Sequence, residues 1–321
     1  MRAVVTGSAG FIGSHLCEQL LGRGWQVSGV DSFAATYDTL GRRHRASQLT
    51  VHPGYEFIEG DLNSVDFSHL VSEADVVFHL AARPGVRASW RDFAQASNAN
   101  ILATQRILAA IAEHPSTRLV FSSSSSVYGQ VEELPVREDH LLAPISPYGV
   151  TKASCEALLT AYTSQYEISA VSLRYFTVYG PRQRSDMAFT RWIRAALRGE
   201  PIRVFGDGKA IRDFTYVGDV VSATALAGME HSPGHRIYNV AGGSPVTLED
   251  VLSMIEELTG RVIEVIYEDR ALGDPDRTGG DTTLIRDDLG WRPEWSLRDG
   301  LSAHVEWVRD SSRSQLAAVP A

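Results

Sequence analysis

The chain has 321 residues, of which 44% are hydrophobic and 21% are charged, and its formal net charge is −9. This length supplies enough core for one large domain or two closely joined ones, while the negative charge excludes the basic surface that nucleic acid requires. No apolar run reaches the roughly 18 residues of a membrane span, so we expect no membrane partner. The two cysteines, Cys17 and Cys155, cannot form a disulfide framework, which favours a reduced, cytoplasmic setting.

Short β-branched runs alternate with amphipathic helical patterns through the first half of the chain. This alternation predicts an α/β domain built on a doubly wound parallel sheet. We expect strands at 4–6, 26–30, 55–58, 76–79, 118–121 and 170–173, and helices at 14–23, 100–113 and 147–166.

The pattern changes after Tyr175, where glycine- and proline-rich loops separate helices near 187–198, 219–230 and 247–259. We therefore expect a nucleotide-binding domain over residues 1–175 and a smaller C-terminal α/β substrate lobe over 176–310. A segment of about 210–230 is expected to return to the first domain. Residues 311–321 are small and polar, which predicts a frayed tail.

Three glycines, Gly7, Gly10 and Gly13, directly follow the first strand and open the first helix. Glycine permits a tight turn and lets a pyrophosphate approach the helix N-terminus, whose free N–H groups favour an anion. The spacing alone is a weak signal, but Asp31 at the end of the second strand makes it a Rossmann-type dinucleotide site. A carboxylate there can accept both ribose hydroxyls and would repel a 2′-phosphate, and no arginine follows at once, so NAD is favoured over NADP.

Further cofactor contacts are expected where the next strands end. Asp61 can meet the adenine amino group, although a helix N-cap is an alternative role for it. Small residues after the fourth strand allow the backbone to approach the cofactor. The expected cofactor-binding set from these motifs is Gly7, Gly10, Phe11, Ile12, Gly13, Asp31, Asp61, Leu62, Leu80, Ala81 and Ala82.

Tyr148 and Lys152 lie four residues apart, so they share one face of the expected helix. A tyrosine with a pKa near ~10 is a poor base at neutral pH, and a neighbouring ammonium favours its phenolate. The phenol could then exchange a proton with a sugar hydroxyl while hydride moves to NAD. Of the 30 lysine and arginine residues only Lys152 and Lys209 are lysines, which is mild evidence that position 152 requires a compact charge.

The glycine motif, His79-Leu80-Ala81-Ala82, Ser125-Ser126-Val127-Tyr128-Gly129, the Tyr148 and Lys152 pair, and Arg174-Tyr175-Phe176 together resemble the extended short-chain dehydrogenase/reductases that act on nucleotide sugars, the NAD-dependent epimerase/dehydratase family. The resemblance covers about residues 1–305. It implies that Ser124 completes a triad with Tyr148 and Lys152, and that Asn100 and Tyr175 line the cofactor side. It also implies a homodimer formed through helices near 95–113 and 148–166.

Within that family, Ser125 and Ser126 occupy the positions where dehydratases carry an Asp-Glu pair and decarboxylases a glutamate. Serine cannot supply that acid chemistry, so a 4-epimerase is favoured and a UDP-glucuronate decarboxylase is less favoured. The stretches around Thr177, Arg184 and Arg87 resemble the UDP-glucuronate 4-epimerases, with Arg182-Gln183 as a departure. A 4-epimerase of UDP-hexoses with a neutral sugar, UDP-glucose or UDP-N-acetylglucosamine, stays the alternative.

The expected substrate residues follow from this resemblance and from charge. Donors near the sugar would hold a carboxylate through charge-assisted hydrogen bonds. Arg212 and Arg277 match family positions that clamp the nucleotide pyrophosphate, a task that suits the arginine fork. The substrate set is Arg87, Ser125, Ser126, Thr177, Arg184, Arg212 and Arg277, and we assign no metal site.

Overall fold

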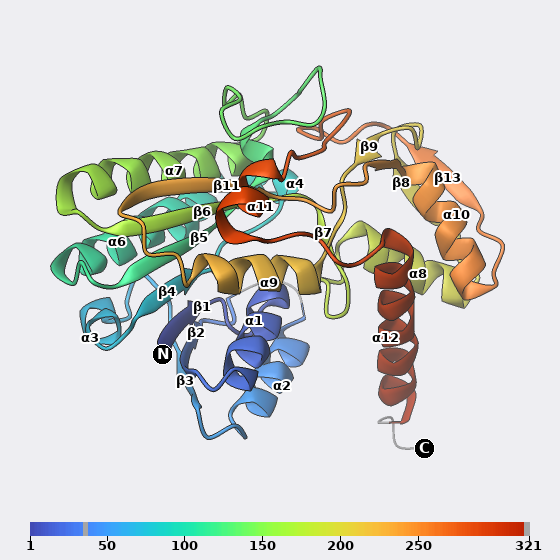
Figure 1. Ribbon diagram of the computed structural model, residues 1–321. Coiled ribbons are helices and arrows are strands. Elements are labelled where there is room, and N and C mark those ends of the chain that lie inside the picture. Colours follow the sequence, from blue (N-terminus) through green and yellow to red (C-terminus); the bar gives the residue numbers. More distant parts are fainter. Residues whose placement is uncertain (35–37, 318–321) are drawn as a thin grey trace.

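Seven strands form one central parallel sheet in the computed structural model, which describes residues 1–34 and 38–317, with side chains described to residue 311 (Figure 1). The strands in spatial order are β11 (Gly234–Val240), β6 (Ser169–Tyr175), β5 (Arg118–Ser124), β4 (Val76–His79), β1 (Arg2–Thr6), β2 (Gln26–Asp31) and β3 (Tyr55–Glu59). Because the strand order reverses between β1 and β4, ligands are expected outside the carboxyl ends of these two strands. The doubly wound α/β fold predicted from the sequence is thereby confirmed.

The sheet is buried on both faces, as parallel sheets are. In β1, Ala3 and Val5 pack into a core shared with α1 and α9, whereas Val4 packs into a second core shared with α6 and α7. Successive side chains of a strand point to opposite faces, and both faces are buried. The strands therefore appear in the sequence as continuous apolar runs rather than as alternating polar and apolar residues.

Helices cover each face of the sheet, with α1, α2 and α9 on one side and α3, α6 and α7 on the other (Figure 1). The helices of this domain are α1 (Phe11–Gly22), α2 (Thr39–Leu49), α3 (Phe67–Ser72), α4 (Val86–Arg91), α5 (Phe93–Ser97), α6 (Ala103–Glu113), α7 (Pro147–Tyr166), α9 (Val217–Ala227) and α11 (Thr283–Leu289). A single 3₁₀ turn, η2 (Ser125–Val127), follows β5.

The helix expected from residue 100 instead begins with a π-helical turn, η1 (Asn98–Leu102), which leads into α6. Such turns are rare and often lie beside functional sites. Here the Asn100 side chain accepts a hydrogen bond from the Arg83 backbone at 2.7 Å and donates one to Thr151 Oγ1 at 3.0 Å. The turn therefore ties the loop after β4 to α7.

The second lobe packs three helices around small sheets. Its helices are α8 (Ala188–Arg198), α10 (Leu248–Thr259) and α12 (Leu297–Ala317). Its strands pair as β8 (Ile202–Phe205) with β13 (Val265–Glu268), β7 (Val178–Tyr179) with β10 (Thr215–Tyr216), and β9 (Ile211–Arg212) with β12 (Val246–Thr247). These three pairings place the end of β8 and the Arg212 strand beside the carboxyl edge of the main sheet, where both contribute to a common cavity.

Two elements of the expected second lobe, β11 and α11, belong with the central sheet, and part of the expected tail is helical. Residues 234–240 form β11 and pair with β6 over their full length, so the central sheet gains a strand from beyond the return helix α9. Helix α12 continues to Ala317, so residues 311–317 extend a helix rather than forming the expected frayed tail. The rest of that tail, 318–321, lies outside the described residues.

Candidate active site

A cavity of about 1260 Å³ opens at the carboxyl edge of the sheet, and residues of the second lobe complete its wall. Pockets for one small ligand measure roughly 300–1,000 Å³, so this space can accept a dinucleotide and a second ligand together. Of the residues selected by sequence, its lining includes Gly7, Gly10, Phe11, Ile12, Gly13, Asp31, Asp61, Leu62, Leu80, Ala81, Ala82, Ser124, Ser125, Ser126, Tyr148, Lys152, Tyr175, Thr177, Arg87, Arg184 and Arg212.

The glycine turn leaves no room for side chains. A Cβ on Gly13 would stand 2.1 Å from the Gly7 carbonyl oxygen, and one on Gly7, whose φ is +71°, would stand 2.9 Å from the Ala81 nitrogen. Helix α1 begins after Gly10 without a side-chain cap. Its first N–H groups therefore face the cavity edge with no protein acceptor from a capping side chain, which fits the pyrophosphate of a dinucleotide.

Asp31 ends β2 and is only 4% exposed. Its carboxylate accepts hydrogen bonds from the backbone nitrogens of Ala9 at 3.1 Å and Phe33 at 2.9 Å. It also pairs with Arg42 of α2, whose Nη2 lies 2.5 Å from Asp31 Oδ1. Local sequence patterns do not reveal this partner, because Arg42 lies eleven residues away and is one of several arginines on α2.

Of the other expected cofactor residues, Asp61 and Tyr175 line the cavity and Asn100 does not. Asp61 lines the cavity, and its contact with the adenine stays a prediction; it accepts a hydrogen bond from the Asn63 nitrogen at 2.8 Å within a turn, whereas the N-cap of the next helix, α3, is Asp66. Tyr175 lines the cavity with its hydroxyl anchored 2.8 Å from Thr224 Oγ1. Asn100 does not line it; the π-helical turn directs its amide behind the wall, which corrects the expectation of a direct contact.

Tyr148 and Lys152 lie on the first turns of α7, where the helix is fixed by local signals. Ser146 caps the N-terminus by accepting the Gly149 N–H at 3.0 Å, and Pro147 occupies the first turn. The Ser124 side chain, at the end of β5, donates to Ser126 Oγ at 3.1 Å, lines the cavity with Tyr148 and lowers the pKa of its phenol. The three residues expected to form a catalytic triad are thus brought to one wall of the cavity.

Burial shifts the pKa values of Tyr148 and Lys152 in opposite directions. Burial raises the pKa of Tyr148 to about 12, opposed first by Arg184 and then by the Ser124 hydrogen bond. The Lys152 ammonium donates a 2.6 Å hydrogen bond to the Ser122 carbonyl and lies 5.9 Å from the Tyr148 ring centroid. Burial lowers the pKa of Lys152 itself to about 8.

Two arginines and one aspartate gather at the sugar end of the cavity. Arg184 forms a two-point ion pair with Asp186, at 3.0 Å and 2.7 Å. Arg87 stacks over the Phe205 ring at 4.2 Å and, after Arg184, helps to lower the pKa of Asp186. Asp186 and Phe205 line the cavity but escaped sequence reasoning, since one follows a motif residue in a loop and the other ends a strand of the second lobe.

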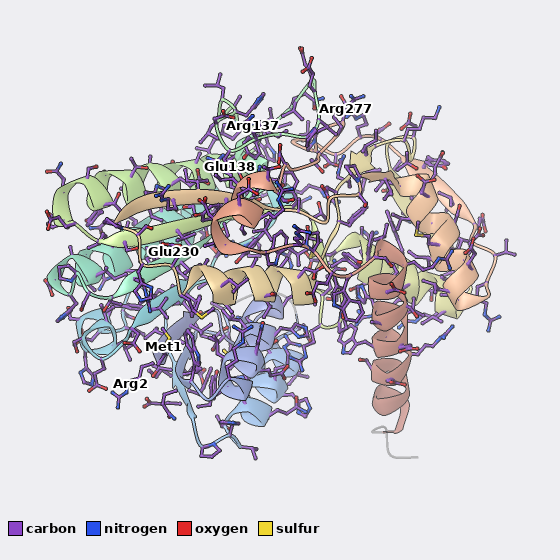
Figure 2. All side chains as sticks on the ribbon, in the orientation of Figure 1. Met1, Arg2, Arg137, Glu138, Glu230 and Arg277 are labelled. Carbon is purple, nitrogen blue, oxygen red and sulfur yellow. The ribbon has the colours of Figure 1, made fainter. Side chains whose placement is uncertain are left out.

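The two expected pyrophosphate arginines separate in the structure. Arg212 is buried at the cavity wall, where Asp274 Oδ1 accepts its Nη2 at 2.7 Å and the Pro275 carbonyl accepts the same nitrogen at 2.7 Å. Arg277 does not line the cavity. It is exposed, bonds the Glu132 carbonyl at 3.4 Å, and lies with Arg137 among the outer loops (Figure 2). An isolated β-bridge to Ile211 fixes the backbone of Arg277, and its side chain does not line the cavity.

No group of three or more metal-ligating side chains is found in the described part of the chain, residues 1–34 and 38–317. Over the same residues, no helix has the length and apolar character needed to cross a bilayer.

These observations define a class of protein: α/β enzymes that hold a dinucleotide at the switch point of a doubly wound sheet, with a tyrosine and a lysine beside the second ligand. Residues 3–241 match the NAD dependent epimerase/dehydratase family. The chain belongs to this family, which confirms the family expected from the sequence and NAD as its cofactor.

Three similar proteins illustrate the range of the match. The chain is 41% identical over 311 residues to an uncharacterized UDP-glucose epimerase, YtcB, of Bacillus subtilis, covering 96% of this chain and 98% of that one. It is 34% identical to a UDP-glucuronate 4-epimerase of Thermodesulfobacterium geofontis, with 96% of both chains covered. A UDP-glucuronic acid 4-epimerase from Bacillus cereus, solved as a Tyr-to-Phe variant with UDP-4-deoxy-4-fluoro-glucuronic acid and NAD, superposes with a TM-score of 0.94 at 39% identity, over 97% and 100% of the chains.

Proposed function

We propose that the chain is a UDP-glucuronate 4-epimerase, which interconverts UDP-glucuronate and UDP-galacturonate through a 4-keto intermediate. The chain is an NAD-dependent nucleotide-sugar 4-epimerase, and the proposal concerns which sugar it accepts. The observation that carries it is the charge at the sugar end of the cavity. Arg87 and Arg184 both line the cavity and both lower the pKa of Asp186, so two cations stand beside this carboxylate, and their charge favours an acidic sugar.

In this proposal Tyr148 takes the proton of the C4 hydroxyl and later returns it, with Ser124 holding the phenolic oxygen by its hydrogen bond. NAD, when bound, supplies the acceptor and donor of hydride and adds a positive charge beside the phenol. Lys152 orders the wall through the Ser122 carbonyl. Because the pKa of Tyr148 is about 12 before that charge is added, its proton leaves only when the complete site is assembled.

Inversion at C4 requires the keto sugar to turn over while the nucleotide stays anchored. Arg212 is suited to that anchoring, since it is buried and its fork is already oriented by Asp274 and by backbone carbonyls. Arg277 stands outside the cavity with its guanidinium bonded to the Glu132 carbonyl, and its share in the anchoring stays a prediction.

The serine and threonine hydroxyls support retention of the carboxylate. The 4-keto form of a glucuronide is a β-keto acid, which tends to lose carbon dioxide. Ser125, Ser126 and Thr177 line the cavity near Tyr148, and we infer that they hold the carboxylate so that the C5–C6 bond stays out of line with the carbonyl π system. No acidic side chain occupies positions 125 and 126, which disfavours the decarboxylase.

One observation favours the alternative, a 4-epimerase of neutral UDP-hexoses. Asp186 already engages Arg184 at two points, so part of the positive charge is matched before any sugar enters. An acidic sugar would then have to share Arg184 with Asp186, whereas a neutral sugar would leave the ion pair intact.

We also infer a homodimer from apolar exposure on the helices named above. Leu102 is 52% exposed, Val150 is 40% exposed and Tyr166 is 50% exposed, all along η1 and α7. Large exposed apolar side chains on neighbouring helices favour a protein interface. Size-exclusion chromatography with light scattering tests this, and a monomeric mass across micromolar concentrations would reject it.

The function is tested by incubating the purified protein with UDP-glucuronate, without added cofactor, and following products by proton NMR. We expect UDP-galacturonate with no pentose and no net NADH. UDP-xylose or a 4-keto-pentose would identify a decarboxylase. No change with UDP-glucuronate but turnover of UDP-glucose would identify the neutral-sugar epimerase. As a test of carboxylate retention, T177A or S126A should release carbon dioxide and a pentose product; the absence of both would reject that role.

A further inference from the structure

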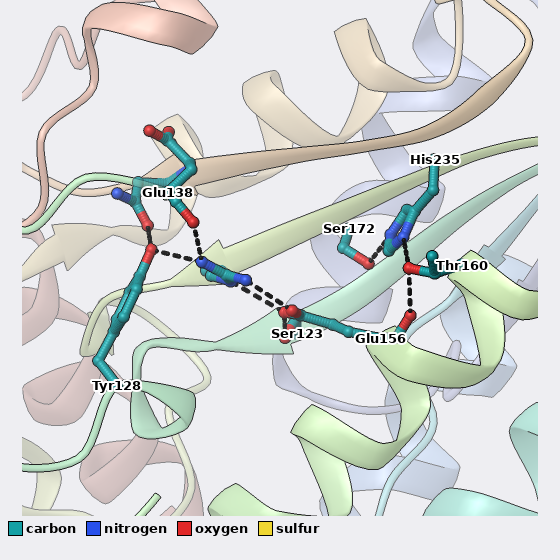
Figure 3. Close-up of polar contacts among 9 residues, drawn as sticks. Ser123, Tyr128, Glu138, Glu156, Thr160, Ser172 and His235 are labelled. Atoms are coloured by element: carbon teal, nitrogen blue, oxygen red, sulfur yellow. Dashed lines mark hydrogen bonds and ion pairs between the residues drawn. The ribbon is translucent and has the colours of Figure 1, made fainter. Parts of the chain in front are cut away.

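A buried ion pair lies one helical turn beyond Lys152 on the same face of α7. Glu156 is 3% exposed and Arg174 of β6 is 2% exposed. Arg174 donates from Nε to Glu156 Oε1 at 3.0 Å and from Nη2 to Glu156 Oε2 at 2.7 Å, which is the two-point geometry that arginine and carboxylate favour (Figure 3). Neither residue entered the proposed chemistry above.

The carboxylate also reaches the strand that carries the active-site serines. Ser123 Oγ donates to Glu156 Oε1 at 2.5 Å, as Figure 3 shows. The residues on either side of Ser123 each contact a reactive group: the Ser122 carbonyl accepts the Lys152 ammonium, and Ser124 hydrogen bonds to Tyr148. Glu156 therefore fixes the end of β5 between the two points where that strand meets the reactive side chains.

The far end of the network is equally anchored. Arg174 Nη1 donates to the Tyr128 hydroxyl at 2.8 Å and to the Glu138 carbonyl at 2.9 Å. The Tyr128 hydroxyl donates in turn to Asn239 Oδ1 at 2.7 Å (Figure 3). The pair is thus linked to β5, β6, β11 and the loop after η2, and these links restrict how far the Glu156 carboxylate can move.

Stability alone is a weak reason for such a pair. Two charges taken out of water lose hydration that their attraction only partly restores, and apolar replacements of buried pairs are often neutral or stabilising. We propose that Glu156, held by Arg174, is a positioning residue of the epimerase site: it fixes the serine end of β5 through Ser123 and places a carboxylate one turn of α7 from the Lys152 ammonium. The proposal rests on the proposed function only in requiring turnover of a UDP-sugar.

The charged and titratable groups around Lys152 support the electrostatic part. Tyr148 and Cys155 have raised pKa values because they are buried, and burial with the charge of Lys152 lowers the pKa of His79 to about 3. All three are therefore neutral near pH 7. Burial lowers the pKa of Lys152 to about 8, and Cys155 first and then Glu156 act in the opposite direction, raising it. Without that carboxylate, Lys152 would lose its proton closer to neutral pH.

The test is the pH dependence of kcat/KM in E156Q, on whichever UDP-sugar the wild-type enzyme turns over. Glutamine keeps the shape and an acceptor oxygen but removes the charge, so the alkaline limb should move to lower pH by about one unit. E138Q is the matched control, because Glu138 is in the same network and its carboxylate bonds the Asn239 nitrogen rather than facing Lys152. Its alkaline limb should coincide with that of the wild type.

S123A separates positioning from charge, since it removes the link to β5 and leaves both charges. We expect kcat to fall by about fivefold or more, with an unchanged alkaline limb. A folded, NAD-loaded E156Q whose pH profile superimposes on the wild type would overturn the electrostatic role. A wild-type kcat in S123A would overturn the positioning role, even if E156Q failed to fold. Failure of the acidic-sugar proposal appears in the wild-type enzyme itself, as turnover of neutral sugars alone.

Discussion

The carboxylate of Asp31 and the guanidinium of Arg42 form a buried ion pair at the end of β2, where the adenosine ribose of a dinucleotide is expected. A lone carboxylate at this position repels the 2′-phosphate of NADP. With a cation beside it, the repulsion is weaker, so Arg42 reduces a discrimination that Asp31 alone would impose.

Replacement of Arg42 should therefore sharpen the preference for NAD. In R42A we expect the ratio of NADP to NAD dissociation constants, measured by calorimetry on cofactor-stripped protein, to rise about tenfold. R43A is the control, since Arg43 lies on the same helix but pairs with the exposed Glu59. A ratio that is unchanged in R42A would mean that the pair is structural only.

Gly13 should tolerate no side chain. A methyl group there would lie 2.1 Å from the Gly7 oxygen, so G13A must displace the glycine turn, and we expect loss of bound NAD together with a lower Tm. Gly22 lies on the same helix with nothing within 4 Å of its Cβ position, so G22A should keep NAD and raise stability by about 0.5–1 kcal/mol. Cofactor content measured after denaturation distinguishes the two, and normal NAD content in G13A would contradict the packing argument.

Removal of the Tyr148 hydroxyl should abolish proton exchange without emptying the site. We expect Y148F to lower kcat by about 10²–10⁴-fold while NAD binding is retained. Y166F serves as the control, because Tyr166 is half exposed at the far end of α7. The NMR assay measures both, and a Y148F enzyme with more than a tenth of wild-type activity would assign the base elsewhere.

The pH profile should report on Lys152. Its pKa of about 8 lies below the ordinary lysine value, so the ammonium is present at neutral pH and is lost as pH rises through about 8. We therefore expect kcat/KM to fall across that range. K152R, whose charge persists at all accessible pH values, should be slower but should lack this alkaline limb. An alkaline limb near pH 8 that persists in K152R would assign the titration to another group.

Arg184 should distinguish acidic from neutral sugars. In R184A we expect KM for UDP-glucuronate to rise by about tenfold or more, and KM for UDP-glucose to change by less than about threefold, since only the former carries a carboxylate. D186N is the converse variant, because it releases Arg184 from its two-point ion pair and should favour the acidic sugar. Equal effects of R184A on both sugars would assign Arg184 to the shared part of the substrate.

Local sequence patterns are sufficient to predict the architecture and the list of reactive groups. Alternating strands and helices, the glycines of the first turn, Asp31, and the four-residue spacing of Tyr148 and Lys152 are local patterns, and each acts through neighbours in the chain. The parallel sheet and the cavity at its carboxyl edge follow from those patterns, because parallel strands end at the same edge.

Tertiary structure decided the partners, because each joins residues that are distant in sequence or are equivalent in composition. Arg42 against Asp31, Asp274 against Arg212, and Glu156 between Ser123 and Arg174 are such pairs. Arg277 and Asn100 match family motifs, but their sequence positions do not determine where their side chains point. The direction of each side chain depends on the backbone that carries it, which is an outer loop for Arg277 and a π-helical turn for Asn100. Local patterns fix which groups a chain carries, and packing fixes which charges those groups meet.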